Sequence, residues 1–522
     1  MQNRSLKKLC GFLATAAIAL MLVVLGGRLW LVERAGSDLP LWDQWWSDFG
    51  TVVLPLSQGT LDFSSLAKAH NEHHLFFQRV ILTSLMAVSG RWEPRDALIV
   101  SALARAIGLA VIFLVLARHQ SMRTRGILLV LLATLGAMPV GTFNLLSGFQ
   151  IQFFIGEPLA IVALALLFDG RLTVERLAAA MSLLLLALLN MATPLITSLG
   201  AIAVFGLRIA LKRGERSRNL AAASALGIFV LFTFATTPRT TYLQARSFSE
   251  FAPVFVRLVS WPAPDFPILG ALALVPPVLL LRRLVREPFM PGSSWFVFAL
   301  ALTAWIQNGA IAFARARSGQ TAFPQYLDGL WLGHLISLLA LAEVLRPKAG
   351  KSAILQARAC AVWGLCLFTG LVADASLRGL PLVERVREVV ARRQPAFADA
   401  MARGDLSAFE GETQEVDQMM RKGEYQFFDD PTGRFAIPAP VYSRLADDNT
   451  RRSLVPFLPA ILVSAEPSWI SRAMRLVSRS APLTAGIGLV LLVLSLREAF
   501  GRTAENSPRT GIARQKDAEP EG

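Results

Sequence analysis

The run Leu9–Val32, LCGFLATAAIALMLVVLGGRLWLV, decides what kind of protein this is, because its 24 residues carry only one charged side chain, Arg28. A helix needs about 20 apolar residues to cross the hydrocarbon core of a bilayer. Arg4, Lys7 and Lys8 precede the run as they would in a signal peptide, but the run is too long for one and lacks a convincing small-residue cleavage site. The pattern therefore predicts a first membrane span that the protein retains.

Composition extends this interpretation to the whole chain. Of its 522 residues, 54% are hydrophobic and 17% are charged, whereas soluble domains have about 25% charged residues. Because lipid offers the backbone no hydrogen-bond partners, each apolar run that crosses must be a helix. The sequence thus predicts an all-α, polytopic transmembrane protein with about twelve spans. After the first, the predicted spans are 97–117, 126–142, 153–168, 177–193, 195–211, 220–237, 266–281, 293–313, 327–345, 357–375 and 481–497.

The basic residues indicate the orientation. The formal net charge is +15, but the basic side chains form small clusters between the apolar runs, as a topology signal requires, and we expect no nucleic-acid partner. With twelve crossings, every cluster lies on the side of the N-terminus, so the positive-inside rule places both termini in the cytoplasm. The clusters are Arg118, Arg123 and Arg125; Arg171 and Arg176; Lys212, Arg213, Arg216 and Arg218; Arg282, Arg283 and Arg286; and Arg346, Lys348 and Lys351.

One further apolar segment, Leu75–Gly90, tests this count. Gln78 and Arg79 interrupt it early, and a crossing there would move every later basic cluster to the outside. We therefore predict that it is an amphipathic or re-entrant helix at the outer interface.

Three long regions then face the outside, namely 33–96, 238–265 and 376–480. The predicted organisation is a membrane domain over 1–375, a small α-rich extracytoplasmic domain over 376–480, a final span over 481–497 and a disordered cytoplasmic tail over 498–522. All three cysteines fall in apolar runs. A disulfide framework, a cysteine zinc site and a thiol nucleophile are therefore not expected.

The first outer loop holds the residues most typical of a catalytic site. Asp43 stands among Trp42, Trp45 and Trp46, which suggests a carboxylate on an interfacial aromatic platform. The alternative is an aromatic belt, in which tryptophans anchor the chain at headgroup level and the carboxylate is only solvated. The belt does not explain the polar cluster that follows in the same loop.

That cluster is Ala69-His70-Asn71-Glu72-His73-His74, with Arg79 shortly after it. If it is helical, His70 and His74 share one face. His70, Glu72 and His74 could then bind a metal, but the spacing differs from the His-Glu-x-x-His of zinc hydrolases. Hydrogen bonding to substrate or to the fold explains the same residues, so we predict substrate contacts and no metal.

Other candidates lie at the outer ends of later spans. Arg315 and Arg317 lie at the outer end of the ninth span, where positive charge opposes the topology bias. Such a charge is expected to meet an anion, and the phosphate of a lipid-linked substrate is one candidate. The alternative is that the side chains snorkel to the lipid headgroups. Gln150 belongs to a polar outer hairpin, and Glu157 follows it inside a span, where a carboxylate is a functional candidate by default.

Together, Asp43-Gln44-Trp45, His70-Asn71-Glu72-His73, Phe149-Gln150 and Arg315 resemble the GT-C class of membrane glycosyltransferases, and more narrowly a poorly characterised bacterial group of this type. The resemblance covers about 1–375. It implies a polyprenyl-phosphate-linked sugar as donor, Asp43 as catalytic base, and Arg315 or Arg317 as the charge that neutralises the leaving phosphate. The histidine cluster and Arg79 would orient donor or acceptor.

Two features depart from that class. A span follows the outer soluble region here, and Asp43 has no Asp-x-Asp partner, so no metal or other cofactor is indicated. The expected function is transfer of a sugar to a glycan, lipid or protein acceptor outside the bacterial inner membrane. The alternatives are a transporter or flippase of lipid-linked glycans, a glycan ligase and a non-enzymatic assembly protein. A ligase would place histidines in 376–480, which contains none.

Overall fold

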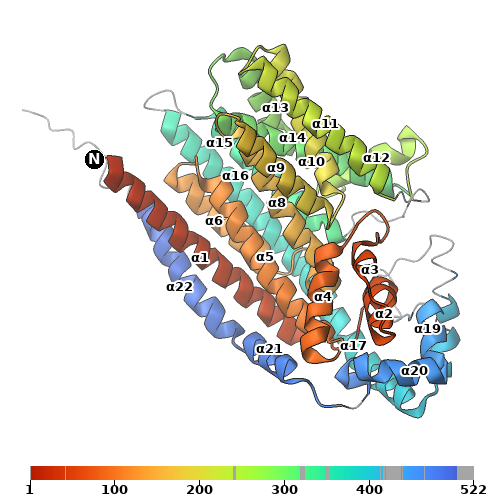
Figure 1. Cartoon of the computed structure of the whole chain (residues 1–522). Coiled ribbons are helices and arrows are strands. Elements are labelled where there is room, and N and C mark those ends of the chain that lie inside the picture. The colour runs from red at the N-terminus through yellow and green to blue at the C-terminus, as the bar shows by residue number, and fades with distance from the viewer. Residues whose placement is uncertain are drawn as a thin grey trace, which may run out of the picture.

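The computed structural model describes residues 2–41, 43–238, 243–317, 324–346, 352–411, 413–415, 418, 437, 439–463 and 465–501. Over these residues the chain is helical and forms no strand, which confirms the all-α prediction. Long helices run side by side, and shorter helices gather at one end of them (Figure 1). Trp42, Lys348, Lys351 and the part of the predicted tail beyond Gly501 lie outside the described residues. The prediction of disorder from 498 was wrong for residues 498–501, which continue the last helix as far as Gly501.

Within that part of the chain, nine helical stretches are long and apolar enough to cross a membrane. This supports an integral membrane protein. The helices that contain or form them are α1 (Gln2–Ala35), α5 (Pro94–Ala117), η2 with α8 (Gly148–Gln150 and Ile151–Phe168), α10 (Thr193–Ala210), α11 (Arg216–Thr236), α14 (Gly292–Arg315), α15 (Leu327–Val344), α16 continued into α17 (Ser352–Asp374 and Leu380–Arg403) and α22 (Ala481–Gly501).

The other three predicted spans are also helices, namely α6 (Met122–Ala137), α9 (Val174–Leu188) and α13 (Pro267–Arg286). The first two have 16 and 15 residues, fewer than the about 20 that a perpendicular crossing needs. The predicted total of twelve therefore stays a prediction. α6 packs on α1 and α16, α9 packs on α8, and α13 packs on α15.

The first and last spans lie against each other along most of their lengths, as Figure 1 shows for α1 and α22. Glycines make this approach possible, because a Cβ at Gly26 would come 2.5 Å from the backbone nitrogen of Ala485, and one at Gly488 would come 2.6 Å from that of Val23. Small residues bring membrane helices close enough for van der Waals packing to hold them together. The C-terminal helix is thus part of the bundle.

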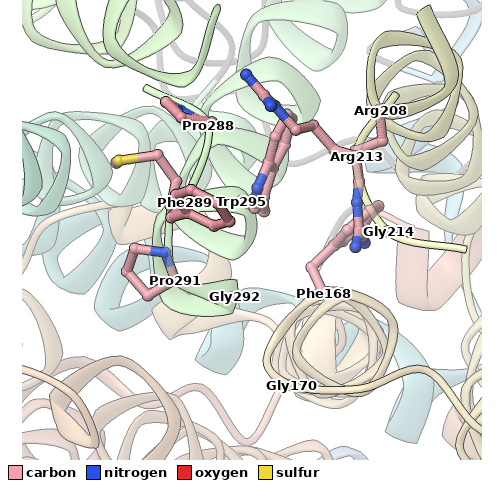
Figure 2. A pocket seen from close by; sticks show the side chains of 11 residues that line it. Phe168, Gly170, Arg208, Arg213, Gly214, Pro288, Phe289, Pro291, Gly292 and Trp295 are labelled. Atoms are coloured by element: carbon pink, nitrogen blue, oxygen red, sulfur yellow. The ribbon is translucent and has the colours of Figure 1, made fainter. Parts of the chain in front are cut away.

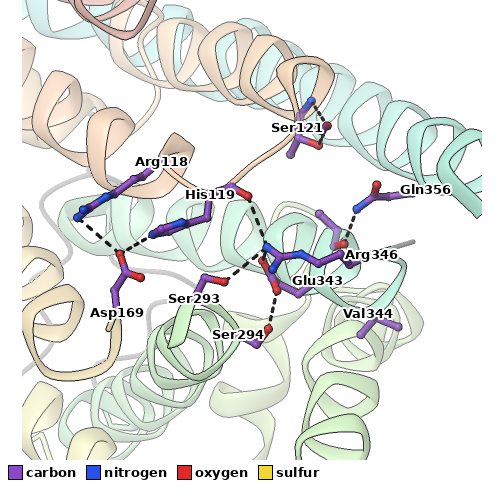
Figure 3. A network of polar contacts seen from close by, with 12 residues as sticks. Arg118, His119, Ser121, Asp169, Ser293, Ser294, Glu343, Val344, Arg346 and Gln356 are labelled. Atoms are coloured by element: carbon purple, nitrogen blue, oxygen red, sulfur yellow. Dashed lines mark hydrogen bonds and ion pairs between the residues drawn. The ribbon is translucent and has the colours of Figure 1, made fainter. Parts of the chain in front are cut away.

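Described residues of the predicted basic clusters meet at one end of the long helices, which we call the basic end. A cavity of about 450 Å³ lies here between the last turn of α10 and the first turn of α14 (Figure 2). Beside it, Asp169 accepts a hydrogen bond from His119 at 2.7 Å, and Arg346 pairs with Glu343 at 2.6 Å (Figure 3). Loops that are far apart in the sequence therefore share this end.

The opposite end, here called the outer end, carries the shorter helices. They are η1 (Gln44–Val53), α2 (Leu54–Ser57), α3 (Phe63–Ala67), α4 (Phe76–Ser89), α7 (Thr142–Leu146), α12 (Phe248–Val259), η3 (Pro324–Tyr326), η4 (Ala375–Gly379), η5 (Ser407–Phe409), α19 (Ala439–Ala446), α20 (Asp448–Leu454), η6 (Val455–Phe457), η7 (Ala460–Leu462) and α21 (Trp469–Arg479). The apolar segment that tested the span count forms α4, whose 14 residues are too few for a crossing.

The first outer loop and the region 376–480 share one hydrophobic core. Buried side chains from both regions form a single cluster, in which Trp45 and Phe49 lie with Phe397 and Leu445. The region 376–480 also begins without a break, because α16, η4 and α17 form one continuous helix from Ser352 to Arg403. The part of this region that the structure describes is α-rich, as predicted, and is built onto the loop that carries Asp43.

Candidate functional site

The histidine cluster forms a tight turn and not the helix that would place His70 and His74 on one face. The backbone nitrogen of His70 donates to the oxygen of His73 at 2.7 Å, and that of His73 donates to the oxygen of His70 at 3.0 Å. Between them, Asn71 has a φ of 51°, a left-handed conformation that asparagine tolerates. Within the described residues, no group of three or more His, Cys, Asp or Glu side chains could hold a metal ion.

Asp43 lies beside this turn, directly before η1. Its carboxylate is 38% exposed, and its Oδ1 atom lies 3.8 Å from the Nε2 atom of His70. The ring of His70 meets the ring of Phe149 edge to face, with 5.6 Å between centroids. Gln150, next to Phe149 in η2, is buried and accepts a hydrogen bond from Gln152 at 3.1 Å. The structure thus brings Asp43, His70 and the Phe149-Gln150 pair together.

The same turn meets the end of α14 through an ion pair between Glu72 and Arg315. The side chains are 21% and 12% exposed, so the pair lies near the surface of the outer end. The anion that Arg315 meets in this structure is therefore a carboxylate of its own chain. Tyr326 lies beside Arg315, and burial raises the pKa of its hydroxyl, which the Arg315 charge opposes.

The other predicted arginine, Arg317, is exposed and sits just after α14. Its backbone nitrogen donates to the oxygen of Leu243 at 3.1 Å. The chain that follows it, 318–323, lies outside the described residues.

Burial sets the charge of His73, the second histidine of the cluster. It lowers the pKa of His73 to about 4, with Arg315 and His70 acting in the same direction and Glu72 opposing them. His73 is therefore neutral near pH 7, where it can exchange hydrogen bonds but cannot supply positive charge. The cation at this site is Arg315.

Two residues predicted to contact substrate lie in the interior instead. Arg79 is 1% exposed, and its Nη1 atom donates to backbone oxygens of the segment 65–74, including those of Ser65 at 3.3 Å and Lys68. The ring of Trp45 is buried and packs edge to face on Trp92, with centroids 5.4 Å apart. These side chains hold the loop in place, and neither reaches open space in this structure.

The remaining predicted histidine, His74, is half-buried, and its backbone oxygen accepts a hydrogen bond from Arg79 at 3.4 Å. It therefore lies at the start of α4, next to the turn that carries His70 and Glu72.

A buried carboxyl group that sequence reasoning missed supports the same loop. Asp48 in η1 accepts a hydrogen bond from the Nε2 atom of Gln78 at 2.8 Å. Burial raises the pKa of Asp48 to about 8, against the lowering effects of Gln78 and Arg79. This carboxyl group is thus mostly protonated near pH 7.

Below the turn, charged side chains form a network inside the membrane bundle. Arg105 of α5 donates to Oδ1 of Asp328 at 2.8 Å and to Oε2 of Glu157 at 3.3 Å. Asn144 donates to Oδ2 of Asp328 at 3.2 Å. Arg28 lies close by, because its guanidinium group and that of Arg105 face the same Phe154 ring at 5.7 Å and 5.0 Å from the centroid. Glu157 therefore belongs to a buried charge network.

The network and the turn are parts of one site. Tyr326, which lies beside Arg315, and Asp328, which binds Arg105, are two residues apart at the start of α15. Asn144 also donates to the backbone oxygen of Gln325 at 2.8 Å. Polar contacts therefore continue from Asp43 at the surface to Glu157 in the bundle.

The chain was compared with protein-family models, with curated proteins and with solved structures. None of them matches it.

Sequence reasoning missed Arg28, Asn144, Tyr326 and Asp328. Asp328 had a signal, because it is a lone carboxylate at the start of an apolar run, and charge inside a span is a functional candidate by default. Arg28 had the same signal within the first span. Asn144 belongs to the polar outer hairpin from which only Gln150 was chosen. Tyr326 had no signal, since its importance arises from partners far along the chain.

The arrangement supplies two chemical capacities at the outer end. Asp43 offers a half-exposed carboxylate that can accept a proton, with an imidazole nearby to orient it. Arg315 offers a guanidinium group that can bind an oxyanion next to the same turn. A group-transfer reaction with an anionic leaving group uses both.

Proposed function

We propose that the protein is an integral membrane glycosyltransferase, which moves a sugar from a polyprenyl-phosphate carrier to an acceptor outside the cytoplasm. One observation carries the proposal, namely that the half-exposed Asp43 carboxylate and the Arg315 guanidinium flank the same His70–His73 turn at the outer end. Sugar transfer from a lipid phosphate needs a base for the acceptor and a cation for the departing phosphate.

In the proposed reaction, Asp43 takes the proton of an acceptor hydroxyl as that oxygen attacks the anomeric carbon of the donor sugar. A new carbon–oxygen bond forms to the acceptor, and the bond from the anomeric carbon to the phosphate oxygen breaks. The bonding electron pair leaves with the polyprenyl phosphate, whose growing negative charge Arg315 stabilises. His70 orients the Asp43 carboxylate. The reaction requires no redox partner, and we assign it no metal or other cofactor.

The proposal includes twelve crossings of the bacterial inner membrane, with both termini in the cytoplasm. Contacts at both ends of α9 support a crossing by that short helix. It begins near Arg176, which donates to the oxygen of Asp169 at 2.6 Å at the basic end. It ends at Leu188, and the oxygen of the next residue, Leu189, accepts a hydrogen bond from the backbone nitrogen of Phe76 in the first outer loop at 2.8 Å. Full crossings keep the basic clusters on one side, in agreement with the positive-inside rule.

A second candidate function is transport or flipping of a lipid-linked glycan. The network of Arg28, Arg105, Glu157 and Asp328 favours it, because charged side chains on facing membrane helices are typical of substrate and ion pathways.

The test measures sugar transfer from radiolabelled polyprenyl-phosphate sugars in membranes that contain matched amounts of wild type, Asp43→Asn or Asp62→Asn. Asp62 is the control, because it is an exposed carboxylate of the same outer loop that caps α3, and asparagine caps helices equally well. We expect Asp43→Asn to lose about 10²–10⁴-fold in rate and Asp62→Asn to transfer like wild type.

Equal transfer by wild type and Asp43→Asn would remove Asp43 from the mechanism. If wild type transfers no sugar from any donor, the transporter candidate is tested with sealed vesicles, by the rate at which a labelled lipid-linked sugar becomes accessible to an outside hydrolase. Loss of that rate in Glu157→Gln would favour transport.

A further inference from the structure

The cavity at the basic end is the feature that the proposed reaction does not use. It holds about 450 Å³, a volume typical of small-molecule sites. Its wall includes Arg208 from the last turn of α10, Arg213 from the loop that follows, and Trp295 from α14 (Figure 2). The site lies at the other end of the long helices from Asp43.

The two arginines bring positive charge that the described part of the chain does not neutralise. Neither Arg208 nor Arg213 takes part in any ion pair between described residues, and the Nε atom of each is buried without a hydrogen-bond partner. The guanidinium group of Arg208 faces the Trp295 ring, with 5.6 Å between its carbon and the ring centroid. Two buried donors beside a cavity predict an acceptor ligand inside it.

The carboxylates nearest in sequence are already engaged elsewhere. Asp169 binds His119 at 2.7 Å, and Glu215 binds Arg218 at 2.9 Å and Arg171 at 3.1 Å. Glu287, before the loop that lines the cavity, accepts a hydrogen bond from Arg283 at 3.0 Å. Because these carboxylates are already paired, the positive charge of Arg208 and Arg213 calls for an anion from outside the chain.

The first turn of α14 adds to this charge. The helix has 24 residues, and Pro291 at its N-cap provides no side-chain acceptor for the first backbone N–H groups. Gly292, which starts the helix, lines the cavity. The positive end of a helix dipole therefore reinforces the two arginines.

We propose that this cavity binds the phosphate of an anionic lipid headgroup. Phosphate oxygens match the planar donors of arginine. The cavity lies at the ends of two candidate membrane spans, α10 and α14, which is the depth of headgroups in a bilayer. Phe289 lines the cavity while 94% exposed, so an apolar ring is open to a bound lipid at the mouth of the cavity. This inference does not depend on the proposed sugar transfer.

The test uses the full chain, purified in an uncharged detergent and titrated with dihexanoylphosphatidylglycerol, with the bound fraction read by native mass spectrometry. Arg208→Gln and Arg213→Gln should each weaken binding by about tenfold or more, the usual loss when a charged hydrogen-bond partner is removed. Arg282→Gln is the matched control, because Arg282 is an exposed arginine at the same end and does not line the cavity. Arg208→Lys keeps the charge without the planar donors and should weaken binding less than Arg208→Gln.

Three outcomes decide the matter. Loss of binding in the two cavity variants, with Arg282→Gln unchanged, supports the site. Equal affinity in all variants, or equal losses in the control, overturns it. Inorganic phosphate that competes fully with the lipid would support the anion site and overturn its lipid source. Melting curves of each variant without ligand show whether it is folded. If Arg208→Gln is unfolded, Arg208→Lys takes its place in the binding measurement.

Discussion

The buried carboxyl group of Asp48 makes the stability of the outer loop depend on pH. Its pKa rises from 3.8 to about 8 in the folded protein, so the folded state keeps a proton that the unfolded state releases. The folded state therefore loses stability as pH rises from about 4 to about 8, by about 1.4 kcal/mol per pH unit at most. Between about pH 5 and about pH 8 the loss reaches about 4 kcal/mol as an upper limit.

Asp48→Asn removes the titration and keeps the bond, because the asparagine oxygen can still accept the 2.8 Å hydrogen bond from Gln78. Thermal unfolding in detergent at a series of pH values measures the effect. The variant should melt near wild type at about pH 5 and clearly above it at about pH 8. A melting difference that is independent of pH, or one that favours wild type as pH rises, would refute the reasoning.

Asp62→Asn supplies the control in the same loop. Hydrogen bonds from Ser65 and Ser64 lower the pKa of this exposed carboxylate, so it is ionised in both states over the whole range. Its melting difference from wild type should therefore stay constant between about pH 5 and about pH 8.

Three more substitutions test individual contacts. Arg315→Gln should lower sugar transfer by about 10²-fold or more at matched protein level, because the leaving phosphate loses its cation; unchanged transfer would exclude that role. Trp45→Ala should destabilise the protein by about 3–5 kcal/mol in thermal unfolding, because it leaves a void between Trp92 and Phe397; a loss below about 1 kcal/mol would contradict its place in the core. Asp328→Asn should cost about 3–5 kcal/mol, seen as lower folded yield, because Arg105 loses the negative charge 2.8 Å away; normal yield would show that the pair with Glu157 is enough to keep Arg105 in the interior.

The helices could be predicted from the sequence because the bilayer leaves the backbone little choice. Each predicted apolar run lies largely within a helix, as for 327–345, which falls in α15 (Leu327–Val344). The number of crossings is harder to predict, because α6 and α9 have 16 and 15 residues and reach only part of the usual length. The continuous helix from α16 into α17 was not expected, since its apolar part ends near Asp374 and its continuation depends on packing.

The candidate site was predicted in part. The sequence indicated four of its residues, namely Asp43, His70, Glu72 and Arg315. The structure brings them together, although Glu72 and Arg315 are 243 positions apart in the chain. Sequence could not distinguish a substrate contact from a core residue at Trp45, because its packing partner Phe397 lies far along the chain. The tight turn did have a local signal, since asparagine at position 71 favours left-handed backbone.

The buried network and the outer end differ in how their charges are neutralised. The membrane network contains two arginines, Arg28 and Arg105, and two carboxylates, Glu157 and Asp328, so its formal charges balance without a ligand. At the outer end, by contrast, the Asp43 carboxylate is 38% exposed and lies 3.8 Å from its nearest ionisable partner, His70. The proposed base is therefore at the surface, where the acceptor and the lipid-linked donor of the proposed reaction would meet.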